Sequence, residues 1–311
     1  MQCSGFTVRP TDRTKTQLVE LQGRVTELQA KGLGLAAISY DPVETLAAFS
    51  RQRGITFPLL ADAGSETIKR YGILNTVVDE ALGPHKDDPA VKEETQKYVS
   101  AVGVNPIMKG IAFPGTFIVD RRGRVTSRFF EDFYVERNTV SSLLVTVGVH
   151  GGSVAATKVS GAHLDLTTYL SDPAVAPGNR FSLILDITPG PGIHVYAPSA
   201  TGYRAIALNL TPQPGIRVLP VQFPASQTYF FRPLNEHVPV YQKPFTLVQE
   251  LILEGTQEAQ AALRGKENLT FTGTLDYQAC DDKACFNPAS VPLSWTLTLK
   301  SLIRERPNLK K

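Results

Sequence analysis

The sequence predicts an α/β layer domain followed by an all-β sandwich, and three observations lead to this fold class. Residues 11–148 alternate between segments with helical spacing and short apolar runs typical of buried strands. From residue 150 onward, short β-type runs are separated by Pro and Gly. The 311 residues suit two domains, since a domain averages roughly 150 residues. We expect domains at 1–149 and 160–302, joined by a linker at 149–160.

The composition is that of an ordinary globular protein. Apolar residues make up 42% and charged residues 20%, and the net charge of +3 argues against nucleic acid as a partner. No apolar run approaches the roughly 18 residues of a membrane helix, so we expect no membrane span. The start of the chain lacks the apolar core of a signal peptide. Three cysteines allow one internal pair and one single thiol.

The first half opens with a helix, a strand and a second helix. Apolar residues at helical spacing predict a helix over 14–31, with Gly32 as its stop signal. The continuous apolar run 33–40 predicts a buried parallel strand. A helix over 42–53 follows, with Pro42 near its first position and Gly54 after its end.

The rest of the first half adds shorter elements. A strand at 57–62 and a short helix at 65–72 come first. The polar stretch 76–110 is interpreted as a surface insertion with room for one helical turn. Strands at 116–120 and 124–130 then flank a turn, and a final helix is predicted over 135–148.

The second half predicts a β-sandwich from its regular strand and turn signals. Its tail, residues 304–311, is expected to fray. The predicted strands are 181–192, 193–199, 204–210, 216–223, 245–253, 268–280 and 291–300.

A proline stands directly before the β-rich run 116–120, in the stretch GIAFPGTFIVDRRGRV. This arrangement resembles the cis-proline strand of the thioredoxin fold, with Pro114 as the candidate. An ordinary edge-strand proline is the other interpretation.

The neighbouring sequence segments extend this resemblance to a family. The segments KTQLVELQGRVTELQAKGLGLAAISYD and ETLAAFSRQRGITFPLLADAGSETIKRYGI resemble the alkyl hydroperoxide reductase/thiol-specific antioxidant (AhpC/TSA, redoxin) family. The resemblance covers residues 11–148. It implies a thioredoxin-like fold and a peroxiredoxin-like chemistry that reduces peroxides or relays electrons, and hence antioxidant activity.

The chain departs from that family at the catalytic motif. Members carry a Trp-Cys-Pro-Tyr-Cys-type motif where this chain has Thr11-Asp12-Arg13-Thr14. Peroxide and disulfide reduction need a thiolate, and a threonine hydroxyl is too weakly acidic to replace it. We therefore interpret Thr11 and Thr14 as degenerate CxxC positions. Cys3 is interpreted as an incidental thiol.

The resemblance also implies one or two strands before the missing motif. Residues 1–10 alone precede it here, so we expect a start that is truncated and a sheet short of a central strand. A frameshift in the gene is a further hypothesis. If the codons for FTVRPTD are read one nucleotide out of register, they are compatible with a sequence typical of the family just before its cysteines.

The second half carries its own candidate site, the pair Cys280 and Cys285 in YQACDDKACFNPASVPLSW. A zinc half-site would need two further ligands, and His194 and His237 lack the ligand spacing. A structural disulfide and a redox-active pair in an exposed loop both remain open from the chemistry alone. We expect neither a metal nor an organic cofactor.

The sequence around the pair also resembles a known family. GIHVYAPSATGY, FFRPLNEHVPVYQKPFTL and the cysteine segment resemble the amino-terminal, immunoglobulin-like domain of the thiol:disulfide interchange protein DsbD, over roughly residues 160–300. The resemblance implies that Cys280 and Cys285 exchange electrons with a thioredoxin-like domain, without showing which sulfur attacks. It also implies a cap loop, with Tyr229, Phe230 and Phe231 as candidates. His194 and Tyr196 are expected to lie on a strand, with a role in core or edge packing rather than in catalysis.

Together these features predict a bacterial thiol–disulfide oxidoreductase whose exchange is carried by the carboxy-terminal pair. The alternative is an inactive redoxin-fold binding or scaffold protein with a structural disulfide. The expected partner is a thioredoxin-like or disulfide-bearing protein. The second resemblance implies a periplasmic or extracytoplasmic location.

Overall fold

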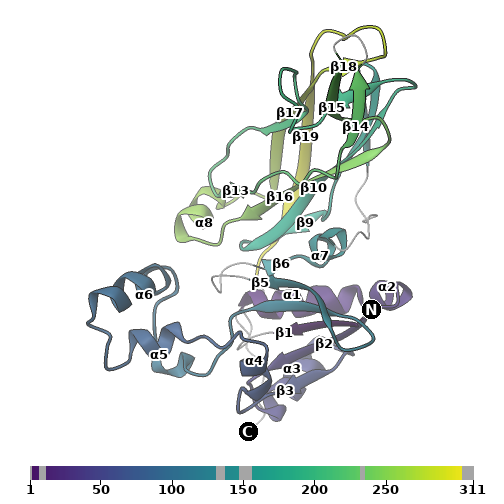
Figure 1. Cartoon of the computed structure of the whole chain (residues 1–311). Helices are drawn as coiled ribbons and strands as arrows, with labels where there is room; N and C mark the ends of the chain where they lie inside the picture. Colours follow the sequence, from purple (N-terminus) through teal and green to yellow (C-terminus); the bar gives the residue numbers. More distant parts are fainter. Residues whose placement is uncertain (1, 7–11, 131–136, 147–155, 232–234, 303–311) are drawn as a thin grey trace. The chain divides into compact units, whose positions relative to one another are not determined.

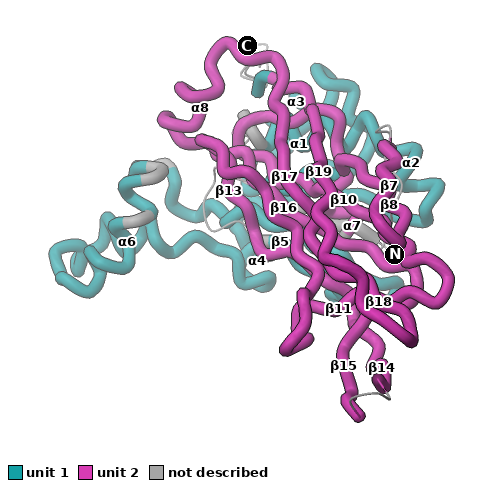
Figure 2. Tube along the Cα trace, turned by 90° about the horizontal axis from the view of Figure 1, so that it is seen from above, with its two compact units in different colours: residues 1–140, 301–311 teal, residues 141–300 magenta. Residues whose placement is uncertain are grey.

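A computed structural model describes all residues except 1, 7–11, 131–136, 147–155, 232–234 and 303–311. The chain forms two compact units (Figures 1 and 2). Unit 1 comprises residues 1–140 and 301–311, and unit 2 comprises residues 141–300. Within the described ranges, every helix is too short or too polar to cross a bilayer.

Unit 1 is built on a mixed five-stranded sheet in the order β3-β2-β1-β4-β5. Strand β1 is parallel to β2 and antiparallel to β4, so it lies in the centre (Figure 1). Our expectation of a sheet short of a central strand is therefore wrong: the residues before the helix themselves form that strand. The strands are β1 (Gln2–Phe6), β2 (Gly34–Ser39), β3 (Leu59–Ala61), β4 (Gly115–Val119) and β5 (Val125–Phe130).

The first predicted helix forms as two. Helix α1 (Asp12–Gly23) and helix α2 (Val25–Ala30) are separated at Arg24, next to a glycine that favours an interruption. Helix α3 (Val43–Arg53) agrees with its prediction, and Gly54 ends it in the left-handed region at φ 63°.

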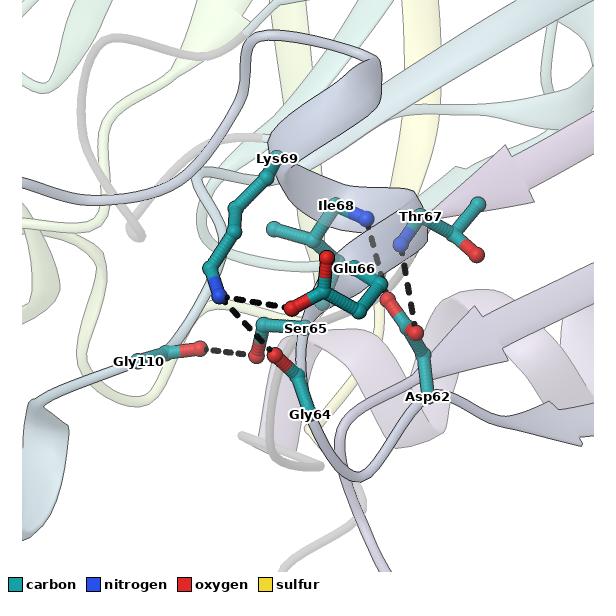
Figure 3. A network of polar contacts seen from close by, with 8 residues as sticks. All are labelled: Asp62, Gly64, Ser65, Glu66, Thr67, Ile68, Lys69 and Gly110. Carbon is teal, nitrogen blue, oxygen red and sulfur yellow. Dashed lines mark hydrogen bonds and ion pairs between the residues drawn. The ribbon is translucent and has the colours of Figure 1, made fainter.

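A local network fixes the start of helix α4 (Glu66–Arg70) (Figure 3). The Asp62 carboxylate accepts hydrogen bonds from the amides of Thr67 and Ile68, at 3.2 and 2.9 Å. Ser65 donates its hydroxyl proton to the carbonyl of Gly110, 2.6 Å away. The network therefore ties the end of the 76–110 insertion to the body of unit 1.

The insertion is more ordered than its sequence indicates. It contains α5 (Val77–Ala81), α6 (Pro89–Val102) and a 3₁₀ turn, η1 (Pro106–Met108). Our expectation of one helical turn is wrong because Asp88 caps α6 by accepting from the amide of Ala90 at 2.9 Å. Tyr98 is buried, and its hydroxyl accepts a hydrogen bond from Asn75 at 2.8 Å.

The final helix predicted for the first half is shorter than expected. Within the residues that the structure describes, β6 (Arg137–Asn138) precedes α7 (Val140–Thr146). Only the second half of the predicted segment is helical in the described chain.

Unit 2 is a β-sandwich, as the sequence predicts. One sheet has the order β13-β16-β10-β8-β7, and a second has the order β12-β17-β19-β9. Their apolar side chains form one core, which includes Phe181, Phe271 and Trp295. These strands are β7 (Thr157–Gly161), β8 (Leu164–Leu170), β9 (Ala174–Val175), β10 (Asn179–Pro189), β12 (Ala207–Leu210), β13 (Ile216–Val218), β16 (Phe245–Leu253), β17 (Asn268–Tyr277) and β19 (Ala289–Leu299).

A third sheet in unit 2, also of four strands, contains Cys280. Its order is β14-β15-β11-β18, and Figure 1 shows β14, β15 and β18 together at one end of the unit. A short helix, α8 (Gln257–Leu263), begins at Thr256, whose hydroxyl accepts from the amide of Ala259. The four strands are β11 (His194–Tyr196), β14 (Gln227–Phe231), β15 (Glu236–Tyr241) and β18 (Ala279–Cys280).

Candidate functional site

The backbone of a tight hairpin brings Cys280 and Cys285 together. The two residues face each other across an antiparallel bridge. The amide of Asp281 donates to the carbonyl of Ala284 at 3.0 Å, and the amide of Phe286 donates to that of Ala279 at 2.9 Å. These bonds flank the cysteines, which makes them a closely spaced, non-hydrogen-bonded pair. Their Cα atoms lie 4.1 Å apart, and the sulfurs form a disulfide bond.

A carboxylate holds the turn between the two cysteines. Asp281 accepts hydrogen bonds from the amides of Lys283 and Ala284, at 2.8 and 2.7 Å. These backbone donors, that of Ala284 most strongly, hold the pKa of Asp281 below its ordinary value. The turn therefore carries a negative charge at neutral pH.

The two cysteine residues differ in how much of their surface is exposed to solvent. Cys280 is 1% exposed and packs with Tyr196, Val238 and Val240. Cys285 is exposed, at the other side of the turn. Protein therefore covers Cys280, and Cys285 is the more accessible of the two residues to an incoming thiolate.

Tyr196 contacts both sulfurs, and nothing in the amino-acid sequence indicated this contact. Its hydroxyl oxygen lies 3.2 Å from Sγ of Cys280 and 3.3 Å from Sγ of Cys285. Disulfide sulfurs carry no hydrogen, so the hydroxyl is the donor in the oxidised state. Burial is the main cause that raises the pKa of Tyr196 to about 12, so this donor keeps its proton.

A second tyrosine and a glutamate support Tyr196. The ring of Tyr203 stacks on that of Tyr196, with centroids 4.2 Å apart and planes at 20°. Tyr203 donates its hydroxyl proton to the Glu236 carboxylate at 2.8 Å. This bond to a carboxylate raises the pKa of Tyr203. The stack fixes the position of the Tyr196 ring beside the disulfide.

The three cap candidates lie in strand β14 and do not share one face of it. Tyr229 belongs to the apolar cluster of Cys280, and its ring centroid is 4.4 Å from that of His194. Phe230 points to the other face, where it is 43% exposed and lies 5.0 Å from the ring of His237. Phe231 is two residues after Tyr229 in the strand, so its side chain points to the same face as that of Tyr229. The role of these residues as a cap stays a prediction, and the hairpin tip at 232–234 lies outside the described residues.

The sites predicted in unit 1 hold no thiol. Thr14 is buried, and its hydroxyl accepts a hydrogen bond from the Arg137 guanidinium at 3.1 Å. Thr11 lies outside the described residues. Cys3 lies in the central strand β1. A cavity of ≈ 10 Å³ close to Thr14 is lined by Gln17, Pro114, Gly115, Thr116, Phe129, Arg137 and Asn138.

The cis-proline prediction for Pro114 is wrong, since all peptide bonds of the described residues are trans. Pro114 does stand directly before strand β4, as predicted. The amide of the preceding residue, Phe113, donates to the carbonyl of Ile73 at 2.7 Å. This bond fixes the backbone of Phe113, the residue before Pro114. The trans isomer of the peptide bond between them is the intrinsically favoured one.

Comparison with known families gives two matches. Residues 6–128 match the profile of the AhpC/TSA family, and residues 168–292 match that of the N-terminal region of thiol:disulfide interchange protein DsbD. The chain therefore combines a thioredoxin-like redoxin domain with a β-rich, immunoglobulin-like DsbD N-terminal domain. A search of curated proteins gives no match.

Solved structures similar to parts of the chain include peroxiredoxins. Bacterioferritin comigratory protein from Xanthomonas campestris is 15% identical over 42% of this chain and 67% of its own, with a TM-score of 0.31. AhpC from Enterococcus faecalis is 21% identical over 47% and 72%, with a TM-score of 0.31. The N-terminal periplasmic domain of ScsB from Proteus mirabilis is 17% identical over 50% and 55%, with a TM-score of 0.32.

Proposed function

We propose that this protein is a thiol–disulfide oxidoreductase in which the Cys280–Cys285 pair carries the exchange, while the redoxin-type site is degenerate. The observation that supports this most directly is the geometry of the pair. Cys285 is an exposed residue, Cys280 is buried, and a tyrosine hydroxyl contacts both sulfurs. The match to the DsbD N-terminal region supports the same chemistry.

In the proposed exchange, a partner thiolate attacks Sγ of Cys285. The bond between Cys280 and Cys285 breaks, and Cys280 leaves with the electron pair as a thiolate. The Tyr196 hydroxyl lies within hydrogen-bond distance of this leaving sulfur and stabilises its charge. A second partner thiolate then displaces Cys285, so the partner becomes a disulfide and the pair a dithiol. The reverse sequence delivers the two electrons to a partner disulfide.

The partner in this proposal is a thioredoxin-like or disulfide-bearing protein. The proposed location is periplasmic or otherwise extracytoplasmic, because disulfides persist in oxidising compartments. The match to the DsbD N-terminal region is consistent with that location.

A redox titration tests the proposal. All variants carry Cys3→Ser, so that Cys280 and Cys285 are the remaining cysteines. We expect a reduction potential above about −300 mV, which separates exchangeable from structural disulfides. A trapping experiment completes the test: Cys280→Ser leaves the exposed Cys285 free and should capture a thioredoxin-like protein as a mixed disulfide. Cys285→Ser, the matched variant, should capture far less.

A second candidate function is a catalytically inactive redoxin-fold binding or scaffold protein. The absence of a thiol at Thr14, whose hydroxyl is engaged by Arg137, favours this alternative for unit 1. A potential well below about −300 mV and no trapped partner would support a structural disulfide instead of exchange.

A further inference from the structure

A histidine lies opposite the buried cysteine. In the antiparallel pairing of β11 with β18, His194 is the direct partner of Cys280. Side chains at directly opposed positions lie on the same face of a sheet, with Cβ atoms roughly 5 Å apart. His194 is 2% exposed, so protein, not solvent, surrounds the imidazole and the sulfur.

Aromatic side chains hold the imidazole in place. The ring of Tyr229 lies 4.4 Å from that of His194 with planes at 35°, and the ring of Tyr196 meets it edge-on at 5.5 Å. Tyr229, Tyr196 and Cys280 belong to the same apolar cluster. His194 is therefore fixed on the side of the sheet where the sulfur chemistry takes place.

The proposed exchange leaves one step without a base. Once Cys285 is joined to a partner, the buried Cys280 must lose its proton before it can attack. Burial disfavours the thiolate, which raises the pKa of such a thiol. A group beside Cys280 that accepts this proton would make the step efficient at neutral pH.

Among the described residues around Cys280, the other ionisable groups are poor bases. Tyr196 has a pKa of about 12 and keeps its proton. The Asp281 carboxylate is engaged by two amides, which lower its pKa. Strand β15 adds apolar Val238 and Val240 to this face, and its Glu236 accepts from Tyr203. Tyr229 on β14 covers the imidazole.

We infer that His194 is the general base that takes the proton of the Cys280 thiol, so that the buried sulfur can release a partner from Cys285. The Cys280 thiolate attacks Sγ of Cys285, and the bond between Cys285 and the partner breaks. The partner sulfur leaves with the electron pair as a thiolate. The proton remains on the imidazole, where the nearby charge of Asp281 favours it. This inference rests on the proposed function and names the group that controls its second half.

The state of the imidazole suits this task. Burial lowers the pKa of His194, and the negative charge of Asp281 opposes that shift. His194 is therefore neutral at pH 7 and able to accept a proton. The rate of a step that needs neutral His194 should rise as the pH increases through the lowered pKa of His194. Above that pKa the rate should be constant.

The test uses the reagent DTNB, which measures the thiols without a protein partner. In the Cys3→Ser background, the reduced protein first forms a mixed disulfide at the exposed Cys285. It then releases a second thionitrobenzoate when Cys280 attacks. The second phase is independent of DTNB concentration and is followed by stopped-flow absorbance from pH 5.5 to 9.5, in wild type, His194→Gln and His194→Phe.

We expect His194→Gln to slow the second phase at pH 6–7 by at least tenfold, since general bases contribute roughly 10²–10⁴-fold. The deficit should shrink to less than about threefold at pH 9.5, where solvent removes the proton. The first phase should stay within about twofold of wild type. His237→Gln is the matched control, because His237 is exposed and lies on Phe230 at the other face of β14.

An unchanged second phase in His194→Gln would overturn the inference, and so would an equal slowing at every pH or of both phases. Thermal unfolding of the oxidised variants shows whether the site has folded, and His194→Phe repeats the measurement with a ring that packs but cannot accept a proton. Failure of the proposed function is separable, because it appears as absent exchange with a thioredoxin-like protein while both DTNB phases remain.

Discussion

At the scale of single residues, Tyr196 shows what the sequence could and could not predict. Its place on a strand was predicted correctly, and its burial agrees with one of the two expected alternatives, core or edge packing. Its contact with both sulfurs was not, because Cys280 and Cys285 are separated from it by 84 and 89 positions. The pairing of β11 with β18 creates that contact, and a local pattern of residues contains no information on it.

Replacing Tyr196 by Phe should slow attack on the disulfide by roughly tenfold or more. The change removes one hydrogen bond to a developing thiolate, and bonds to charged groups contribute about 1.5–3 kcal/mol. The rate of reduction by a thioredoxin-like protein measures it. Tyr203→Phe is the control, since it keeps the stack on Tyr196 and removes only the contact with Glu236. Equal effects of the two changes would contradict the assigned role.

At Thr14, the interpretation as a degenerate CxxC position stays a prediction. A threonine cannot replace a thiolate, and the structure adds that its hydroxyl is buried against Arg137. We expect peroxide consumption by the Cys280→Ser, Cys285→Ser protein to equal the uncatalysed rate, both with Cys3 and with Cys3→Ser. A rate that falls when Cys3 is replaced would instead reveal a reactive thiol in β1.

At the scale of elements, continuous apolar runs were predicted well, whereas polar segments and the alternating strand β8 were not. Strand β16 coincides with its predicted segment, and β10 and β19 overlap theirs but begin two residues earlier. These strands were found because their apolar side chains fill the sandwich core. Helix α6 was missed, although Asp88 and Pro89 are start signals, because its composition is polar. Strand β7 was missed for the same reason: its side chains are mostly exposed.

The cysteine hairpin depends on one carboxylate for its turn. Asp281→Ala removes the acceptor for the amides of Lys283 and Ala284, so the two thiols should be less well held together. We expect the reduction potential to become less negative, by a shift on the order of 10 mV. Asp281→Asn keeps an acceptor oxygen and should shift it less.

The pH dependence of this turn follows from its lowered pKa. A carboxyl whose folded pKa is depressed contributes stability above the unfolded value of about 3.9 and loses it as pH falls through the folded value. The effect of Asp281→Ala on the potential should therefore be the same at pH 5 and pH 7. A difference that vanishes already at pH 5 would contradict the lowered pKa.

At the scale of the whole molecule, the proposed function concentrates the chemistry at one end of unit 2 and leaves unit 1 as the scaffold of a redoxin domain. We expect the sandwich to fold without the disulfide. The bond closes a loop between positions five apart, and so short a loop stabilises by about 2 kcal/mol. Reduction should therefore lower the melting temperature of unit 2 by several degrees without unfolding it. Loss of cooperative unfolding after reduction would contradict this view.

The core of unit 2 contains the single tryptophan of the chain. Trp295 is 4% exposed, and its indole N–H donates to the Thr168 hydroxyl at 2.7 Å, which joins β19 to β8. Its emission therefore reports from one domain alone. Far-ultraviolet circular dichroism averages over both halves, so a mismatch between the two optical signals during denaturation would show that the halves melt separately. The native protein thus carries its own fluorophore for that experiment.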